Sequence, residues 1–123
     1  MKIAKTYRFE AAHRLEGWLE EHKCHRLHGH SYKVEVEVSG PVARFGNGAI
    51  VDFGELDECW KPLFRMMDHK YLNDVYGEKN LTAEYLAERI CTHFRSWHFT
   101  NPEAHITRVR VWETENAWAE FTP

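Results

Sequence analysis

The chain begins with an alternating run of apolar and polar residues. Between Lys2 and His13 the positions Ile3, Tyr7, Phe9 and Ala11 fall on odd numbers, and His13 shares their parity. Because successive side chains of a strand point to opposite faces, this spacing predicts a half-buried strand with His13 on its covered face. A second run, from His28 to Val38, has its apolar residues on even numbers, so that His28 and His30 share one face.

Two helices are predicted in the middle of the chain. Asp52, with Glu55 three residues later, matches an N-cap and capping box. Apolar residues then recur at helical spacing, as Phe53, Leu56, Trp60, Leu63, Phe64 and Met67. Pro62 interrupts this pattern and should bend the helix or end it early. A second helix is expected from about Thr82 to about Phe94.

Two further strands are expected after the second helix. They are ITRVRVWE at 106–113 and AWAEF at 117–121, joined by the short turn TEN. The order strand, strand, helix, helix, strand, strand predicts an α+β fold, with a four-stranded antiparallel sheet and both helices on one side. The length is typical of one domain, and we expect residues 1–123 to form a single unit.

The charge and composition of the chain argue against some classes of partner. The formal net charge is -3 at pH 7, and no block of Lys and Arg residues occurs. Nucleic acids and anionic membranes attract clustered positive charge, so neither is the expected partner. The apolar runs typical of a membrane span or a signal peptide are also missing, which predicts a cytoplasmic protein.

The cysteines are odd in number and far apart, which favours free thiols over a disulfide framework. Cys59 and Cys91 fall within the helical patterns, where small buried residues are expected. Cys24 differs, because it belongs to a segment rich in histidine.

The segment CHRLHGH at 24–30 contains the clearest candidate chemistry. Histidines at i and i+2 on a strand project in the same direction, so His28 and His30 can reach one cation. His13 faces the same side, and three neutral imidazoles with an open fourth position are typical of a catalytic zinc site. Cys24 is either a fourth ligand, which would make the site structural, or a base or nucleophile just outside the metal shell.

Two other places in the chain each have two interpretations. Asp68 and His69 are adjacent, and such a pair beside a thiol can form a proton relay, although a charged helix end is the simpler interpretation.

Glu113 shares the parity of Val109 and Val111, and a buried carboxylate is costly unless it is paired. Its two acceptor oxygens suit a ligand with two adjacent N–H groups. The alternative is that the strand has ended and Glu113 is solvated.

Taken together, FEAAHRL, CHRLHGHSYKVEV, VDFGELD, DHKYLN, LTAE and VWETEN resemble the 6-pyruvoyltetrahydropterin synthase family. The similarity extends over almost the whole chain. Three residues separate Cys24 from HGH, a spacing that resembles the carboxy-forming branch of the family, whereas pyruvoyl-forming relatives usually have a longer gap. The resemblance implies the tunnelling fold, in which three subunits join their sheets into a barrel. Two trimers then stack as a homohexamer with active sites between subunits.

The resemblance also implies roles for individual residues. The expected zinc ligands are His13, His28 and His30. Cys24 is expected to be the general base, and Asp68 and His69 are expected to assist proton transfer. Glu113 is expected to anchor the pterin, and Thr82 to contact it from a neighbouring subunit.

The activity implied by the resemblance is that of a zinc-dependent lyase. Its substrate is 7,8-dihydroneopterin triphosphate, and its products are 6-carboxy-5,6,7,8-tetrahydropterin, acetaldehyde and triphosphate, on the way to queuosine. The alternatives are the pyruvoyl-forming reaction, which eliminates triphosphate without cleaving the side chain, and a noncatalytic zinc- or pterin-binding module. One departure from the family is Leu81, where relatives often have proline.

Overall fold

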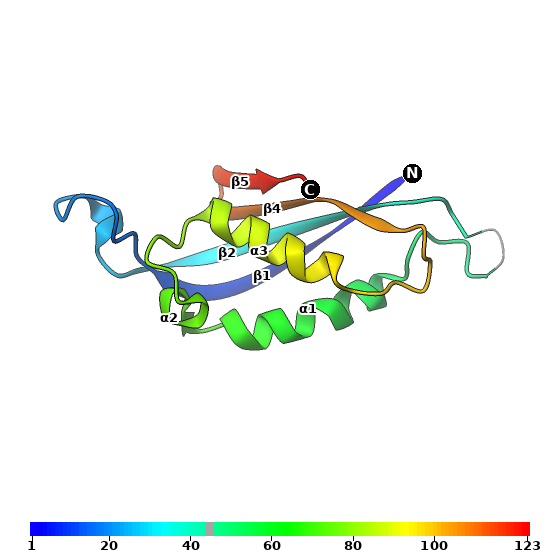
Figure 1. Cartoon of the computed structure of the whole chain (residues 1–123), viewed down its shortest axis with the longest axis horizontal. Helices are drawn as coiled ribbons and strands as arrows, with labels where there is room; N and C mark the ends of the chain where they lie inside the picture. The colour runs from blue at the N-terminus through cyan, green and yellow to red at the C-terminus, as the bar shows by residue number, and fades with distance from the viewer. Residues whose placement is uncertain (44–45) are drawn as a thin grey trace.

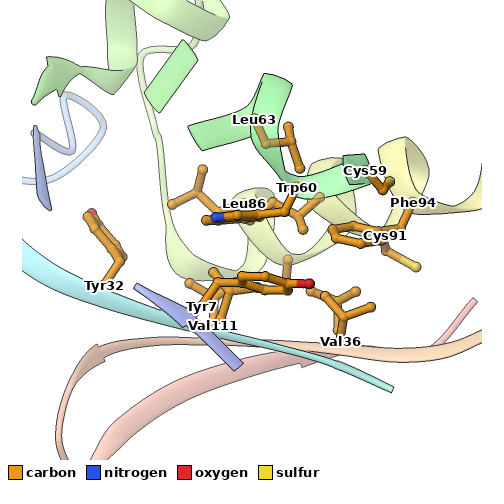
Figure 2. Close-up of a cluster of buried hydrophobic side chains, with 14 of the residues drawn as sticks. Tyr7, Tyr32, Val36, Cys59, Trp60, Leu63, Leu86, Cys91, Phe94 and Val111 are labelled. Atoms are coloured by element: carbon orange, nitrogen blue, oxygen red, sulfur yellow. The ribbon is translucent and has the colours of Figure 1, made fainter. Parts of the chain in front are cut away.

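The structure is a computed structural model that describes residues 1–43 and 46–123. Its elements in chain order are β1 (Lys2–His13), the 3-10 turn η1 (Lys23–His25), β2 (His28–Ser39), α1 (Phe53–Met67), β3 (Lys70–Tyr71), α2 (Leu72–Tyr76), α3 (Ala83–Arg95), β4 (His105–Thr114) and β5 (Ala117–Phe121). The strands form one sheet in the order β3-β1-β2-β4-β5. Figure 1 shows α1 and α3 running along the sheet, and Figure 2 shows both helices above the strands.

The two long strands pair as the alternating pattern predicts. β1 and β2 are antiparallel, and their register places His13 opposite His28 and Ala11 opposite His30. The odd-numbered side chains of β1 from Tyr7 to His13 are buried, as are the even-numbered side chains of β2 from Tyr32 to Val38. The hairpin therefore presents one apolar face to the helices and carries the histidines at one end of that face.

The α+β fold and its main element order are confirmed, but the sheet has one strand more than predicted. β3 pairs with β1 in parallel, through Ala11 with Lys70 and Ala12 with Tyr71, so the sheet is mixed rather than purely antiparallel. The short helix α2 was not predicted either. β3 has two residues and α2 has five, which is too short for a hydrophobic period to be visible in the sequence.

Of the two outcomes expected at Pro62, a bend or an early end of the first helix, the early end is contradicted. α1 continues without a break from Phe53 to Met67. Proline removes one backbone donor from the helical ladder, and the carbonyl that loses its partner is that of Glu58. Both Pro62 and Glu58 are exposed, so water can bind that carbonyl at little cost.

Only part of the apolar pattern in α1 reaches the core. Leu56, Trp60 and Met67 are buried, whereas Phe53 and Phe64 remain 48% and 39% exposed. The Trp60 ring stacks on that of Tyr7, with centroids 4.7 Å apart, and this pair fills the space between α1 and the sheet (Figure 2). Helix and sheet therefore meet through large aromatic surfaces, each of which buries much apolar area.

Cys59 and Cys91 are buried free thiols in this core, as expected, and burial raises the pKa of Cys59 to about 12. Neither thiol is in the reactive thiolate form at neutral pH. Among the described residues, no helix is both long enough and apolar enough to cross a membrane.

The start of α1 allows a test of the local structure. The Asp52 carboxylate accepts from the Gly54 N–H at 2.7 Å, and Glu55 reaches back to the Asp52 N–H at 3.4 Å, which completes the predicted capping box. Asp52→Ala should therefore lower the free energy of unfolding in urea by about 1 kcal/mol. Asp52→Asn keeps an acceptor oxygen and should cost less. Equal losses in the two variants would contradict the capping role.

Candidate metal centre

His13, His28 and His30 meet on the helix-covered face, where β1 ends and β2 begins. One possible ligand atom from each ring lies within 4.8 Å of the others. The centroid of the His13 ring is 4.5 Å from that of the His28 ring and 5.0 Å from that of the His30 ring. The structure thus brings together the three histidines that the sequence places on one face.

Backbone carbonyls fix which nitrogen of two of these rings is free. The Nδ1 atom of His13 lies 2.7 Å from the Leu81 oxygen, and that of His28 lies 2.7 Å from the Arg26 oxygen. A carbonyl can only accept, so Nδ1 donates in both rings and Nε2 keeps its lone pair. The Nε2 atom of His13 is buried and has no hydrogen-bond partner among the described residues. This donor set fits a zinc ion, whose histidine ligands are commonly oriented by such bonds.

The surroundings favour the neutral form of His13 and His30. Burial lowers the pKa of His13 to about 4, and the nearby His28 and His30 act in the same direction. Burial, together with His28, also lowers the pKa of His30. A protonated ring cannot bind a metal, so both residues are held in the form that a metal requires.

Glu113 lies beside the histidines. β4 continues to Thr114, so the interpretation of Glu113 as a solvated residue beyond the strand is wrong. Its side chain is 28% exposed, and its Oε1 atom is 3.9 Å from the Nε2 atom of His13. Burial raises the pKa of Glu113, and the charge of Glu84 adds to this effect. An acceptor group that is partly desolvated is therefore available next to the cluster.

Asp68 and His69 form a direct pair at the edge of β1. The His69 Nδ1 atom is 2.7 Å from Asp68 Oδ2, and the other carboxylate oxygen accepts from the Glu10 N–H at 3.0 Å. The Glu10 N–H and the His69 ring hold the pKa of Asp68 below its usual value. His69 has a φ of 56°, a conformation that is uncommon outside glycine and is often found at functional sites.

The side chains of Asp68 and His69 lie toward solvent rather than in the core. His69 is 77% exposed, whereas the three clustered histidines point to the helix-covered face. An open hollow of about 530 Å³ lies beside it, lined by residues that include His69, Tyr71, Ser31 and His30. The Asp68–His69 pair and the histidine cluster thus approach the same end of the sheet from different sides.

Cys24 lies in η1, in the loop between β1 and β2, and is half-buried. Its backbone is anchored, because its N–H donates to the His22 ring at 3.1 Å and its carbonyl accepts from the Leu15 N–H at 2.8 Å. The group of possible metal ligands found in the described residues contains the three histidines without Cys24. Among the described residues, no hydrogen bond joins the Cys24 thiol to His69. The role of Cys24 as a base therefore stays a prediction.

Thr82 and Leu81 form the junction before α3. Thr82 is the N-cap of α3, and its hydroxyl accepts from the Tyr85 N–H at 3.2 Å. Leu81 is fully buried and provides the carbonyl that orients His13. A leucine where relatives often have proline therefore leaves this backbone contact in place. The contact of Thr82 with a ligand stays a prediction.

Asn73 is a supporting residue that the sequence analysis missed. It is 94% buried, and its amide donates to the carbonyls of Arg14 and Lys79 at 2.9 and 3.1 Å. Its side-chain oxygen accepts from the Arg14 N–H at 3.0 Å. Asn73 thus ties the chain after His13 to the segment that leads to Leu81. Its position at the end of the DHKYLN segment is the sequence feature that could have drawn attention to it.

Solved structures show which fold this is. The structure of Caenorhabditis elegans 6-pyruvoyl tetrahydropterin synthase matches with a TM-score of 0.86 at 23% identity, covering 100% of this chain and 95% of that one. The Plasmodium vivax 6-pyruvoyl tetrahydropterin synthase matches with a TM-score of 0.71 at 17% identity, with coverage of 100% and 98%. The fold is the one found in tetrahydropterin synthases.

Sequence comparisons identify the family. The family model described as 6-pyruvoyl tetrahydropterin synthase matches residues 2–123. The chain is 35% identical over 121 residues to the putative 6-carboxy-5,6,7,8-tetrahydropterin synthase of Archaeoglobus fulgidus, covering 98% of this chain and 95% of the relative. It is 29% identical over 143 residues to the 6-carboxy-5,6,7,8-tetrahydropterin synthase of Haemophilus influenzae, with coverage of 98% and 97%. The chain belongs to the 6-pyruvoyl tetrahydropterin synthase family.

A relative with another activity also matches. The dihydroneopterin monophosphate aldolase of Pyrococcus furiosus is 31% identical over 117 residues, covering 92% of this chain and 91% of the relative. Its identity to the chain lies between those of the two synthases above. Overall similarity therefore does not separate these reactions, and the choice depends on the site.

The buried His13 predicts how the metal-free protein responds to acid. Its pKa is lowered from 6.5 to about 4, so between these values the unfolded chain binds more protons than the folded one. The free energy of unfolding should fall as the pH decreases through this window, by at most about 1.4 kcal/mol per pH unit from this residue. Urea unfolding of the wild type and of His13→Asn, which cannot titrate there, measures the difference. Parallel pH profiles for the two proteins would contradict it.

Proposed function

We propose that this chain is a zinc-dependent 6-carboxytetrahydropterin synthase. It converts 7,8-dihydroneopterin triphosphate and water to 6-carboxy-5,6,7,8-tetrahydropterin, acetaldehyde and triphosphate in the route to queuosine. The observation that carries the proposal is the cluster of three oriented histidines with the Glu113 carboxylate beside it. The spacing of Cys24 and the relatives named as 6-carboxy-5,6,7,8-tetrahydropterin synthases favour the carboxy-forming reaction.

The three histidines are proposed to hold one zinc ion through ring nitrogens. The lowered pKa values of His13 and His30 and the buried free Nε2 atom of His13 support this choice. A zinc ion bound there supplies Lewis-acid polarisation of the hydroxyl and carbonyl oxygens of the substrate side chain. The reaction reduces the ring and oxidises the side chain within one molecule, so that it needs no external electron carrier.

The remaining residues are proposed to bind the pterin and to move protons. Glu113 accepts from the adjacent N–H groups of the pterin ring, and the Cys24 sulfur removes a carbon-bound or hydroxyl proton. Asp68 orients the His69 ring through its Nδ1 atom, which leaves the exposed Nε2 atom to exchange protons. The Glu10 N–H keeps Asp68 ionised for this task.

We also propose that the chain assembles as a homohexamer, a dimer of trimers, with each site shared between subunits. β3 covers β1 over two residue pairs, so most of that edge has unpaired backbone groups in a single subunit. The exposed His69 lies at the same edge. Closing the sheets into a barrel would pair this edge and bring His69 and Thr82 to a neighbouring site. Light scattering that finds a fully active monomer would contradict this.

Product analysis tests the reaction directly. The zinc-loaded protein is incubated with 7,8-dihydroneopterin triphosphate, and acetaldehyde, triphosphate and the pterin product are identified. Acetaldehyde released together with 6-carboxytetrahydropterin supports the proposal. Triphosphate without acetaldehyde indicates the pyruvoyl-forming reaction, and an absence of turnover indicates a binding module. Turnover restricted to dihydroneopterin monophosphate would favour the aldolase activity named for the Pyrococcus furiosus relative.

Two substitutions separate metal binding from proton transfer. His28→Ala removes one of three proposed ligands, so most of the zinc should be lost after dialysis. Cys24→Ala should keep one zinc per subunit and lose turnover, because the thiol is proposed to act outside the metal shell. Metal analysis and activity are measured on both variants. Zinc lost from Cys24→Ala would indicate a structural site with four ligands, and full zinc in His28→Ala would rule out the histidine site.

A further inference from the structure

Tyr32 is a fully buried tyrosine next to the histidine cluster. It follows His30 by two residues on β2 and faces the same side, with its ring 5.5 Å from that of His30 and 5.9 Å from that of His13. Its ring stacks on Phe9 at 4.9 Å with the planes nearly parallel. The ring is thus held firmly between the apolar core and the histidines.

The hydroxyl of Tyr32 is not explained by the packing of its ring. It is buried and has no hydrogen-bond partner among the described residues. Figure 2 shows its oxygen on the side of the ring that points away from Tyr7 and Trp60. A buried polar group without a partner costs free energy, and phenylalanine would fill the same space without that cost. The hydroxyl therefore points to a state of the protein in which it is bonded.

Glu113 is the candidate acceptor for this hydroxyl. The pairing of β2 with β4 runs through Val34 with Val111 and ends at Lys33 with Trp112, so Tyr32 and Glu113 are the next residues on their two strands. Burial, and after it the charge of Glu113, raises the pKa of Tyr32, which is consistent with a short separation of the two groups.

The Glu113 carboxylate also lacks a partner that fixes its orientation. Among the described residues it accepts no hydrogen bond, and its contact with the His13 Nε2 atom is 3.9 Å long. The Tyr32 hydroxyl, a buried donor, and the Glu113 carboxylate, a partly buried acceptor, thus both lack a hydrogen-bond partner among the described residues.

We propose that Tyr32 is a positioning residue for Glu113, whose carboxylate accepts a hydrogen bond from the Tyr32 hydroxyl when a pterin is bound. A carboxylate has about four lone-pair sites, so both oxygens can still accept from the ligand. Because the ring of Tyr32 is locked by Phe9 and the histidines, this bond would hold the carboxylate in one rotamer before and during catalysis. This inference rests on the proposed function, in which Glu113 binds the pterin.

Tyr32→Phe tests the inference, because it keeps the ring and removes the hydroxyl. The variant should keep its zinc and unfold at the same or a higher temperature, since the hydroxyl has no partner in the ligand-free protein. Its affinity for 6-carboxypterin, measured by fluorescence titration, should fall about ten-fold. Tyr7→Phe is the matched control: it removes another largely buried tyrosine hydroxyl, which donates to Asp57 at 3.2 Å, and should leave pterin affinity unchanged.

A double-mutant cycle with Glu113→Gln separates positioning from a general structural effect. If the hydroxyl acts through Glu113, the double variant should bind the pterin about as weakly as Glu113→Gln alone. Additive losses, an unchanged affinity in Tyr32→Phe, or loss of zinc from that variant would each overturn the role of Tyr32. A wild-type protein that binds no pterin would instead overturn the proposed function, and this inference with it.

Discussion

The hydrogen bond from the His13 ring to the Leu81 carbonyl is the contact on which the candidate site depends most. It joins the end of β1 to the segment before α3, two places 68 residues apart in the chain. It also fixes the tautomer of a buried ring, so that the Nε2 atom is free and directed at the other histidines. Asn73 supports this contact, because it binds the backbone on both sides of the junction, at Arg14 and Lys79.

The groups around this junction differ in how firmly the chain holds them. The histidines stand on long paired strands, and His28 is oriented by its own backbone contact with Arg26. Cys24 stands on a loop that is tied at its backbone, and His69 occupies an uncommon left-handed conformation at a sheet edge. A rigid candidate metal centre with the proposed proton-transfer groups on more exposed segments suits a reaction in which the ligand must enter from the surface.

Much of the framework was predictable because it has a strong local period. Twelve residues of alternating pattern in each of β1 and β2 placed all three histidines on one face, and the capping box marked the start of α1. β3 and α2 are too short to show a period, and they form because the chain turns at His69, whose N–H donates to Glu10 at 2.6 Å. Leu81 and Asn73 support the site through hydrogen bonds between a side chain and a backbone group that are mostly far apart in sequence, so the local pattern does not show them. Tyr32 looked like an ordinary strand residue, because a missing partner is visible only in three dimensions.

X-ray absorption spectroscopy at the zinc edge tests the central claim, that three histidines and no thiol hold the metal. The account predicts one zinc per chain with three nitrogen neighbours at about 2.0–2.1 Å and an oxygen in the open position. The imidazole scattering pattern should be distinct, and the spectrum should contain no sulfur shell. A sulfur neighbour at about 2.3 Å would show that Cys24 closes the site, and would contradict a catalytic centre built on His13, His28 and His30.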